Sequence, residues 1–281
     1  MKYDAILVLD FGGQYCNLIA RRIREHSVYS EIVPCDITTE EIEEMNKTMN
    51  VKGMILSGGP WSVYQEGAPK FDPKILDMGI PILGLCYGHQ MIAYFSDGKV
   101  EPGSKKEYGI AYVTINKPVG ILKGLGPKEK VWMSHGDRVA RLPAGFASHA
   151  RSENSPYAAI GDPARRWYGL QFHPEVTHTR QGKRILERFL FEICGCQALW
   201  NPSSIIDDSI QQVRELAGDH GRVVLGLSGK TIVSALMPSR RKTSARFFSV
   251  VVPCWTQIVA PSNSSNSVMP VSFITIIPCP S

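Results

Sequence analysis

The sequence predicts an α/β protein with an open, mostly parallel sheet, flanking helices, an antiparallel extension and an irregular C-terminal tail. In residues 1–85, short apolar segments rich in β-branched residues alternate with longer amphipathic ones. This alternation is typical of parallel strands joined by right-handed helical crossovers. From residue 108 to 171 the helical pattern stops, and short alternating segments separated by proline and glycine favour antiparallel strands.

Each element is indicated by a local pattern. Residues 5–9 are a continuous apolar run, which is typical of a buried strand, and residues 15–25 carry apolar side chains at helical spacing beside arginines. Thr38 followed by Glu41 has the spacing of a capping box and predicts the start of a helix. Further strands are expected over 31–33, 53–56, 81–85, 169–172 and 222–227, and further helices over 87–95, 179–194 and 205–217.

The expected sheet also predicts where a ligand would bind. In open parallel sheets, ligands bind beyond the carboxyl ends of the strands. The loops that follow Leu9, Leu56 and Leu85 are therefore the expected place for chemistry.

Charge and cysteine content exclude several classes of function. The net charge is +5, but five of the 31 basic residues lie at or after residue 230 and all 26 acidic residues precede it, so residues 1–229 are balanced. The tail has no aromatic stacking pattern beside its basic run, so we expect no nucleic-acid partner. No apolar run reaches the roughly 20 residues of a membrane span. The seven scattered cysteines favour a reducing, cytoplasmic location.

The most informative motif is Gly84-Leu-Cys-Tyr-Gly88, between an expected buried strand and an expected helix. It is the thiol counterpart of the G-x-S-x-G nucleophile elbow, in which glycines allow a tight turn and a close approach of substrate. A helix N-terminus lowers the pKa of a cysteine thiol because it stabilises the thiolate. The pattern predicts Cys86 as a nucleophile, although most isolated cysteines are buried structural residues.

A thiol nucleophile needs a base, and His173-Pro-Glu175 offers one together with an acid. Proline favours an extended backbone at the preceding residue, and in extended chain positions i and i+2 point to the same side. Glu175 could then orient His173 in a Cys-His-Glu triad. The turn Ser57-Gly-Gly-Pro60 and the amide of Tyr87 could supply N–H donors to an oxyanion.

These three motifs, in this order and spacing, closely resemble those of class I (triad) glutamine amidotransferases, which implies the fold of that family over residues 1–195. Residues 10–15 and 133–137 are similar to the glutaminase domains of the GMP synthase family. Residues 222–229 resemble the strand that leads into the ATP pyrophosphatase loop of those enzymes.

The resemblance implies a glutaminase that releases ammonia from glutamine without a cofactor. Its catalytic residues would be Cys86, His173 and Glu175, and the amides of Gly59 and Tyr87 would hold the oxyanion. The amino-acid end of glutamine would contact Gln90, Ser134, Gly136 and Asp137. In the whole synthase, ammonia passes to XMP on an ATP- and Mg-dependent synthetase domain or subunit, in cis or in trans, which makes GMP for purine biosynthesis.

The sequence departs from this pattern after Gly229. Ser228 and Gly229 begin the S-G-G-x-D-S phosphate loop, but its second glycine and its aspartate are missing, so we expect the nucleotide site to be lost. A Walker A loop would need glycine at position 224, which is valine. We interpret 196–229 as a linker with the start of a pyrophosphatase domain, and 230–281 as an aberrant tail from a frameshift, a misjoined exon or a truncated gene.

Other functions stay open at this level. The chain could be an idle remnant without activity, or a triad amidotransferase that serves another acceptor. Cys194-x-Cys196 lacks a second pair of ligands, so no metal site is expected.

Overall fold

A computed structural model describes residues 2–201, 222–228 and 231–237. The chain divides into two units, Met1–Trp200 and Asn201–Ser281. Within the described part of the second unit, β10 (Arg222–Ser228) pairs antiparallel with β11 (Thr231–Met237). The strand expected over 222–227 is present as β10, whereas β11 lies where the sequence pattern had favoured an irregular tail. The β-branched run Thr-Ile-Val at the start of β11 is compatible with a strand. The helix expected over 205–217 lies outside the described residues.

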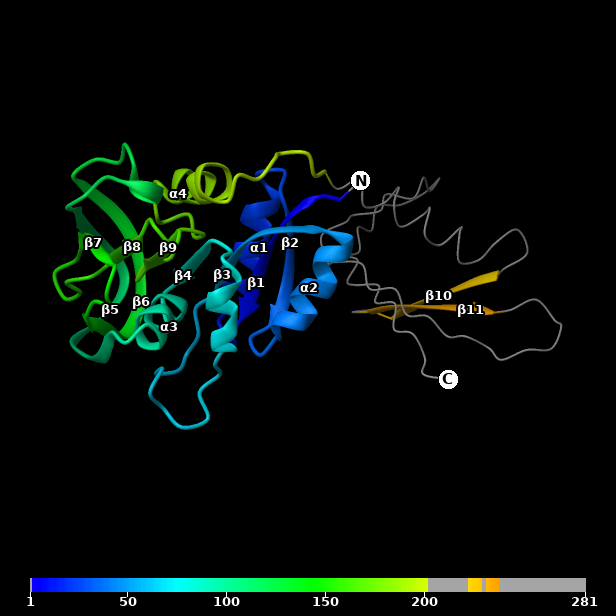
Figure 1. Ribbon diagram of the computed structural model, residues 1–281, viewed down its shortest axis with the longest axis horizontal. Coiled ribbons are helices and arrows are strands. Elements are labelled where there is room, and N and C mark those ends of the chain that lie inside the picture. The colour runs from blue at the N-terminus through cyan, green and yellow to red at the C-terminus, as the bar shows by residue number, and fades with distance from the viewer. Residues whose placement is uncertain (1, 202–221, 229–230, 238–281) are drawn as a thin grey trace. The chain divides into compact units, whose positions relative to one another are not determined.

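The first unit contains one nine-stranded sheet, in the order β2-β1-β3-β4-β9-β8-β7-β5-β6 (Figure 1). The pairs from β2 to β9 are parallel, and those from β9 to β6 are antiparallel, as the sequence predicted. The strands are β1 (Asp4–Asp10), β2 (Tyr29–Pro34), β3 (Asn50–Leu56), β4 (Ile82–Leu85), β5 (Lys99–Ile115), β6 (Lys128–Arg141), β7 (Ala147–Arg151), β8 (Ala159–Asp162) and β9 (Trp167–Leu170).

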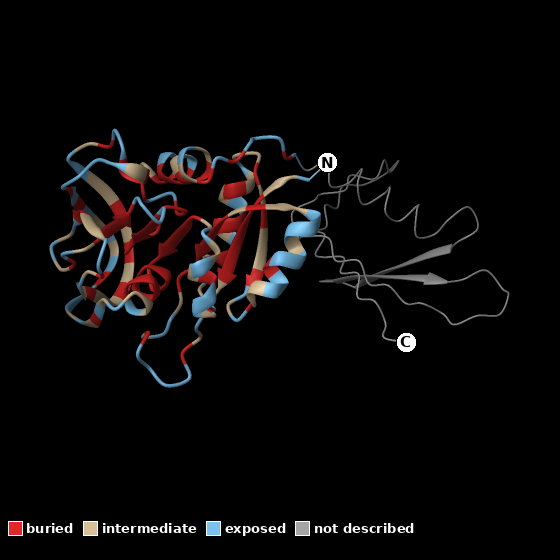
Figure 2. Ribbon diagram, in the orientation of Figure 1, coloured by how far each residue is buried: buried red, intermediate tan, exposed pale blue. Residues whose placement is uncertain are grey.

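Helices cover both faces of the parallel part of this sheet. Alternate residues of β1 separate into two cores: Ile6 and Val8 pack with α1 and α4, while Leu7 and Leu9 pack with α2 and α3. The central strands are almost wholly buried, and α2 presents its outer side to solvent (Figure 2). The α-helices are α1 (Cys16–Arg24), α2 (Thr39–Thr48), α3 (Tyr87–Phe95) and α4 (Gly182–Arg188), with shorter turns η1 (Pro73–Met78) and η2 (Gly120–Leu122).

Side-chain hydrogen bonds account for where α2 and α4 begin. At α2 the predicted capping box is present, because the Glu41 amide donates to Thr38 Oγ1 at 3.2 Å and Glu41 Oε2 accepts from the Thr38 amide at 2.8 Å. The helix expected from residue 179 begins only at Gly182, since Thr179 uses its side chain to bind the His173 carbonyl. It continues as the π-helix η3 (Phe189–Ile193).

The first unit extends beyond residue 195, where the sequence had suggested its end. The Cys196 amide donates to the Leu190 carbonyl, and the Trp200 amide donates to the Ser27 carbonyl, both at 2.9 Å. Both side chains are buried. These contacts attach residues 196–200 to the first unit.

Within the described residues, no helix is long and apolar enough to cross a membrane. In the same part of the chain, no group of three or more His, Cys, Asp or Glu side chains is arranged to hold a metal ion.

Candidate active site

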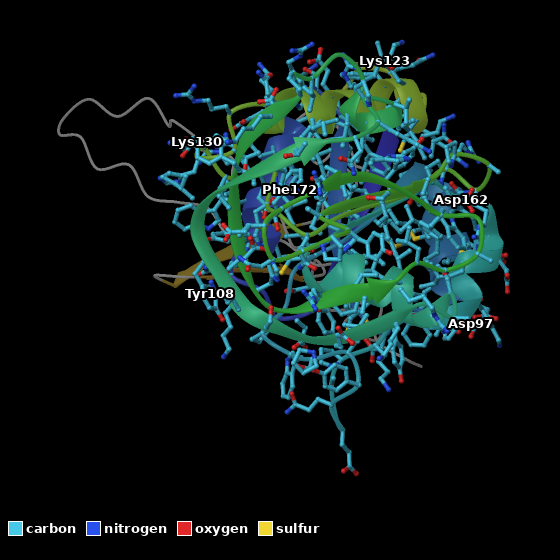
Figure 3. The ribbon with its side chains drawn as sticks, turned by 90° about the vertical axis from the view of Figure 1, so that its left-hand side faces the viewer. Asp97, Tyr108, Lys123, Lys130, Asp162 and Phe172 are labelled. Atoms are coloured by element: carbon cyan, nitrogen blue, oxygen red, sulfur yellow. The ribbon has the colours of Figure 1, made fainter. Side chains whose placement is uncertain are left out.

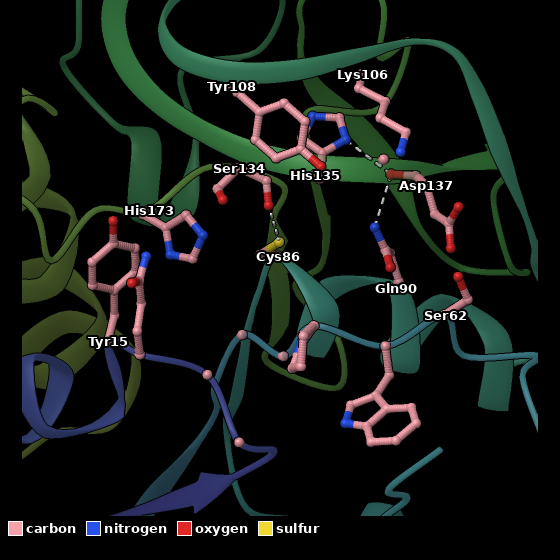
Figure 4. Close-up of a pocket in the computed structure, with 18 of the residues that line it drawn as sticks. Tyr15, Ser62, Cys86, Gln90, Lys106, Tyr108, Ser134, His135, Asp137 and His173 are labelled. Atoms are coloured by element: carbon pink, nitrogen blue, oxygen red, sulfur yellow. Dashed lines mark hydrogen bonds between the residues drawn. The ribbon is translucent and has the colours of Figure 1, made fainter. Parts of the chain in front are cut away.

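A pocket of about 600 Å³ opens where the parallel and antiparallel parts of the sheet meet. The loops after β1, β3 and β4 form one side of it, which is the position that the strand ends predicted. Segments of β5 and β6 form the other side (Figure 4). Among its lining residues are most of the predicted site residues: Gly59, Cys86, Gln90, Ser134, Gly136, Asp137 and His173.

Cys86 occupies a strained turn between β4 and α3. Its φ of 52° and ψ of −99° place a non-glycine residue in a rarely populated conformation, as in a nucleophile elbow. The flanking glycines are needed here, because a Cβ on Gly84 would lie 2.4 Å from the Gly88 carbonyl carbon and a Cβ on Gly88 would lie 2.2 Å from the Leu56 oxygen. The cysteine itself is 4% exposed, and its thiol donates to the Ser134 carbonyl at 3.4 Å.

His173 and Glu175 follow β9 and form a buried pair. Nδ1 of His173 lies 2.7 Å from Oε1 of Glu175, and the other side of the imidazole faces Cys86 (Figure 4). Burial opposes the charged imidazolium, but the Glu175 carboxylate and the Cys86 sulfur outweigh it, so the pKa of His173 is raised well above 6.5. The Glu175 carboxylate therefore stabilises a positive charge on His173, next to Cys86.

The backbone around this pair is firmly held. The His173 amide donates to the Trp132 carbonyl at 3.0 Å, and Thr179 Oγ1 donates to the His173 carbonyl at 2.6 Å. Arg22 Nε donates to the Glu175 carbonyl at 2.8 Å. Three different segments thus fix the position of the imidazole.

The two predicted oxyanion donors belong to two segments that lie next to each other, since a Cβ on Gly59 would lie 3.4 Å from the Tyr87 ring. Gly59 lines the pocket in the loop after β3, and Tyr87 is the first residue of α3. An N–H at the first helical position has no acceptor within its own helix, so the Tyr87 amide is available to a ligand. The loop that carries Gly59 is held by Ser57, whose Oγ accepts from the Phe11 amide at 3.1 Å.

The residues predicted to hold the amino-acid end of the substrate form the opposite wall. Gln90, on α3, donates through Nε2 to the Asp137 carbonyl at 2.9 Å, which ties the helix to β6. Ser134 and Gly136 belong to the same stretch of β6. The β6 part of this wall is therefore one strand segment, fixed by Gln90 to the helix that follows Cys86.

Sequence reasoning missed several residues that line the pocket or lie directly behind its lining. Gln171 is fully buried and lies between Gln90 and Cys86, with Nε2 3.9 Å from the sulfur. Tyr15 packs edge-on against the His173 ring at a centroid distance of 5.0 Å. Tyr15 belongs to the segment 10–15 and Gln171 to the strand expected over 169–172, so a signal was present. The other lining side chains not singled out are Gln14, Trp61, Ser62, Lys106, Tyr108 and His135.

Of the two predicted nucleotide-binding residues, the structure describes only Ser228. Ser228 ends β10, and Gly229 lies outside the described residues. Residues 231–237, which would follow a phosphate loop, form strand β11, whereas such loops lead into the N-terminus of a helix.

The fold and the pocket together define a class of protein: α/β proteins with a cysteine at a strand-to-helix elbow and a buried His-Glu pair beside it. Comparison with known families identifies the particular one. Residues 7–193 match the family model "Glutamine amidotransferase class-I", and the chain belongs to this family.

Comparison with individual proteins shows which members of this family the chain resembles. It is 48% identical over 240 residues to the GMP synthase [glutamine-hydrolyzing] of Acinetobacter baylyi, covering 83% of this chain and 43% of that protein. The corresponding protein of Yarrowia lipolytica is 44% identical over 253 residues, covering 89% and 47%. The chain thus spans less than half the length of these curated relatives and matches their glutaminase part.

Two solved structures have folds similar to that of this chain. A Thermoplasma acidophilum protein provisionally described as one subunit of a GMP synthase is 31% identical, with a TM-score of 0.62, covering 75% of this chain and 99% of that one. A glutamine amidotransferase from Thermotoga maritima, at 21% identity and a TM-score of 0.50, shares the fold over 77% of this chain and 94% of that one.

Proposed function

We propose that this chain is a glutaminase that hydrolyses glutamine to glutamate and ammonia through Cys86, His173 and Glu175. The observation that carries the proposal is the strained Cys86 elbow, which opens into the same pocket as an imidazole paired with a buried carboxylate. A cysteine at such a turn, beside a base that a third group orients, is the arrangement of nucleophilic catalysis on amides.

In the first half-reaction, the Cys86 thiol has given its proton to His173, and the resulting thiolate attacks the carbon of the substrate's side-chain amide. The carbonyl oxygen becomes an oxyanion, which the amides of Gly59 and Tyr87 stabilise. His173, held as an imidazolium by Glu175, then gives its proton to the departing nitrogen. The C–N bond breaks, ammonia leaves, and a γ-glutamyl thioester is left on Cys86.

In the second half-reaction, water attacks the thioester. His173 is now neutral and takes a proton from that water, and the carbon–sulfur bond breaks to release glutamate and the thiolate. His173 is again an imidazolium, so the site returns to its starting state. The sum is one glutamine and one water converted to one glutamate and one ammonia, with no cofactor required.

The opposite wall would recognise the substrate as an amino acid. Gln90, Ser134, Gly136 and Asp137 line this side of the pocket, and a polar wall of this kind suits a zwitterion. A side-chain amide bound by this end would extend toward Cys86.

The destination of the ammonia is part of the proposal. The similarity to GMP synthases supports its transfer to XMP, in purine biosynthesis, on a synthetase domain or subunit that uses ATP and Mg. Because this chain spans less than half of those relatives, the synthetase would act from outside the described residues, in cis or in trans. A cytoplasmic location would agree with the free thiols of the described residues.

The test is steady-state ammonia release from glutamine by the purified chain, with and without an added synthetase from a relative. We expect hydrolysis and a labelled thioester, both reduced at least about 1,000-fold in Cys86→Ala because the covalent route is lost. Cys35→Ala is the matched control, since Cys35 is a free thiol that does not line the pocket. Neither hydrolysis nor labelling under either condition would contradict the proposal and favour an idle remnant.

A further inference from the structure

A second buried histidine–carboxylate pair faces the pocket from the antiparallel side. Nε2 of His135, on β6, lies 3.1 Å from Oε2 of Glu107, on β5. The two side chains are only 3% and 7% exposed. His135 lines the pocket, yet the hydrolysis mechanism uses neither residue.

The hydrogen bonds of this pair fix its protonation and its orientation. Nδ1 of His135 lies 2.9 Å from the Asp137 carbonyl, which can only accept, so this nitrogen carries a hydrogen. Burial would raise the pKa of Glu107, but hydrogen bonds from His135 and Ser152 lower it below its usual value. Because Glu107 is then a carboxylate, its bond to His135 is charge-assisted, and the imidazole cannot turn without losing it.

The pair also lies at an irregularity of the β5–β6 ribbon. Pro102 pairs with Asp137, but the next rung on β5 is Glu107, opposite His135, so residues 103–106 form a bulge. Gly103 and Lys106, in that bulge, line the pocket. The Glu107–His135 bond is thus the first cross-strand contact beyond the bulge and determines where regular pairing resumes. Figure 3 views this end of the sheet, with Tyr108 and Lys130 labelled on its outer side.

The same imidazole holds the atom to which Gln90 binds. The Asp137 carbonyl accepts from both His135 Nδ1 and Gln90 Nε2, each at 2.9 Å (Figure 4). Ser134 directly precedes His135 on β6, and its carbonyl accepts a hydrogen bond from the Cys86 thiol. One side chain therefore fixes a short strand segment whose carbonyls contact both the helix residue Gln90 and the nucleophile.

We infer that Glu107 and His135 are positioning residues for substrate binding: they hold the Ser134–Asp137 wall in the register that receives the amino-acid end of glutamine. This inference rests on the proposed glutaminase function. The pair acts on the wall through the Asp137 carbonyl and takes no part in the chemistry at Cys86.

The test is Glu107→Gln, which keeps the shape of the side chain and removes its charge. We expect the KM for glutamine to rise about tenfold or more, since a hydrogen bond to a charged group is lost. The rate at which iodoacetamide alkylates Cys86 should stay within about twofold, because this small reagent does not need the amino-acid wall. Glu101→Gln is the matched control: Glu101 lies on the same strand and bonds Arg138 of β6 on the other side of the bulge.

Ser152→Ala provides a milder variant should Glu107→Gln fold poorly. Ser152 Oγ donates to Glu107 at 2.8 Å, so its loss should raise KM in the same direction by a smaller factor. If the wild type is active and both variants have the wild-type KM, the inference is overturned but the proposed function stands. A variant in which KM, the alkylation rate and the melting temperature change together would also overturn the inference, since that pattern marks a purely structural role. A wild type that neither hydrolyses glutamine nor reacts with a chloroketone analogue of it would overturn the proposed function as well.

Discussion

The two halves of the sheet contribute to the pocket in different ways. The parallel half supplies Cys86 and Gly59 from loops that directly follow β4 and β3. The antiparallel half supplies Ser134–Asp137 from within β6, next to a bulge. His173 follows β9, the strand that pairs parallel with β4 and antiparallel with β8, so it lies at the junction of the halves.

This difference separates two physical tasks. In the parallel half, tight backbone packing determines the position of the reacting groups. In the antiparallel half, the register of two long strands determines the position of the binding wall. Changes in the first half should therefore affect the rate of the chemical step, and changes in the second half should affect substrate binding. Three sets of variants test this division.

The largest effect is expected for Glu175→Gln at the junction. Loss of the orienting carboxylate should reduce kcat for glutamine hydrolysis by about 10³- to 10⁴-fold, as for other triads, while KM changes little. Steady-state kinetics with ammonia detection measures both. A variant that keeps more than a tenth of the wild-type kcat would show that His173 does not depend on this partner.

The same variant has a pH signature in stability. Since the pKa of folded His173 is raised above 6.5, the pair stabilises the fold fully below pH 6.5, and this contribution is lost as pH rises through the raised pKa. The difference in unfolding free energy between wild type and Glu175→Gln should thus be larger near about pH 6 than near about pH 9. Urea denaturation at the two pH values checks the sign, and an opposite trend would contradict it.

A smaller effect is expected from paired glycine substitutions in the two halves. In Gly88→Ala the new Cβ would lie 2.2 Å from the rigid Leu56 oxygen, whereas in Gly136→Ala it would lie 3.6 Å from the flexible Lys106 side chain. We expect Gly88→Ala to cost about 3 kcal/mol of stability and Gly136→Ala less than about 1 kcal/mol. Thermal and urea unfolding measure both. Equal losses would show that the two halves are packed alike at the pocket.

The smallest of the three effects is expected for Gln90→Ala, which removes the link between α3 and the Asp137 carbonyl. KM for glutamine should rise about tenfold, while kcat and the alkylation rate of Cys86 change little. Tyr94→Ala, on the same helix but more exposed and away from the pocket lining, is the control. A fall in kcat without a rise in KM would place Gln90 with the reacting groups instead.

Predictions from the sequence agree with the structure wherever residues within one short segment determine the local fold. The elbow at Cys86, the capping box at Thr38 and the alternation of β1 depend on residues within a few positions of each other. Helix α3 begins and ends where the pattern placed it. The helix expected from residue 179 began later, because Thr179 makes a tertiary bond to His173 that no local pattern reveals.

The antiparallel wall shows what the sequence could not determine. The motif at 133–137 was visible, but its relation to Glu107, Lys106 and Tyr108 depends on how β5 and β6 pair across their bulge. Similarly, Gln171 lies in the strand expected over 169–172, and only the structure places it between Gln90 and Cys86.

By itself, the sequence determined the order of strands and helices along the chain up to residue 95, the turn at Cys86 and the charge balance of residues 1–229. The tertiary structure decided which side chains converge on the pocket: the His135–Glu107 pair, the edge of Tyr15 against His173, and the ties from Thr179 and Arg22. The physical reason is the distance along the sequence over which each interaction acts. Backbone sterics and capping act over a few residues, whereas strand register is selected by burial on both strands at once, and one residue of slip would turn every side chain to the other face.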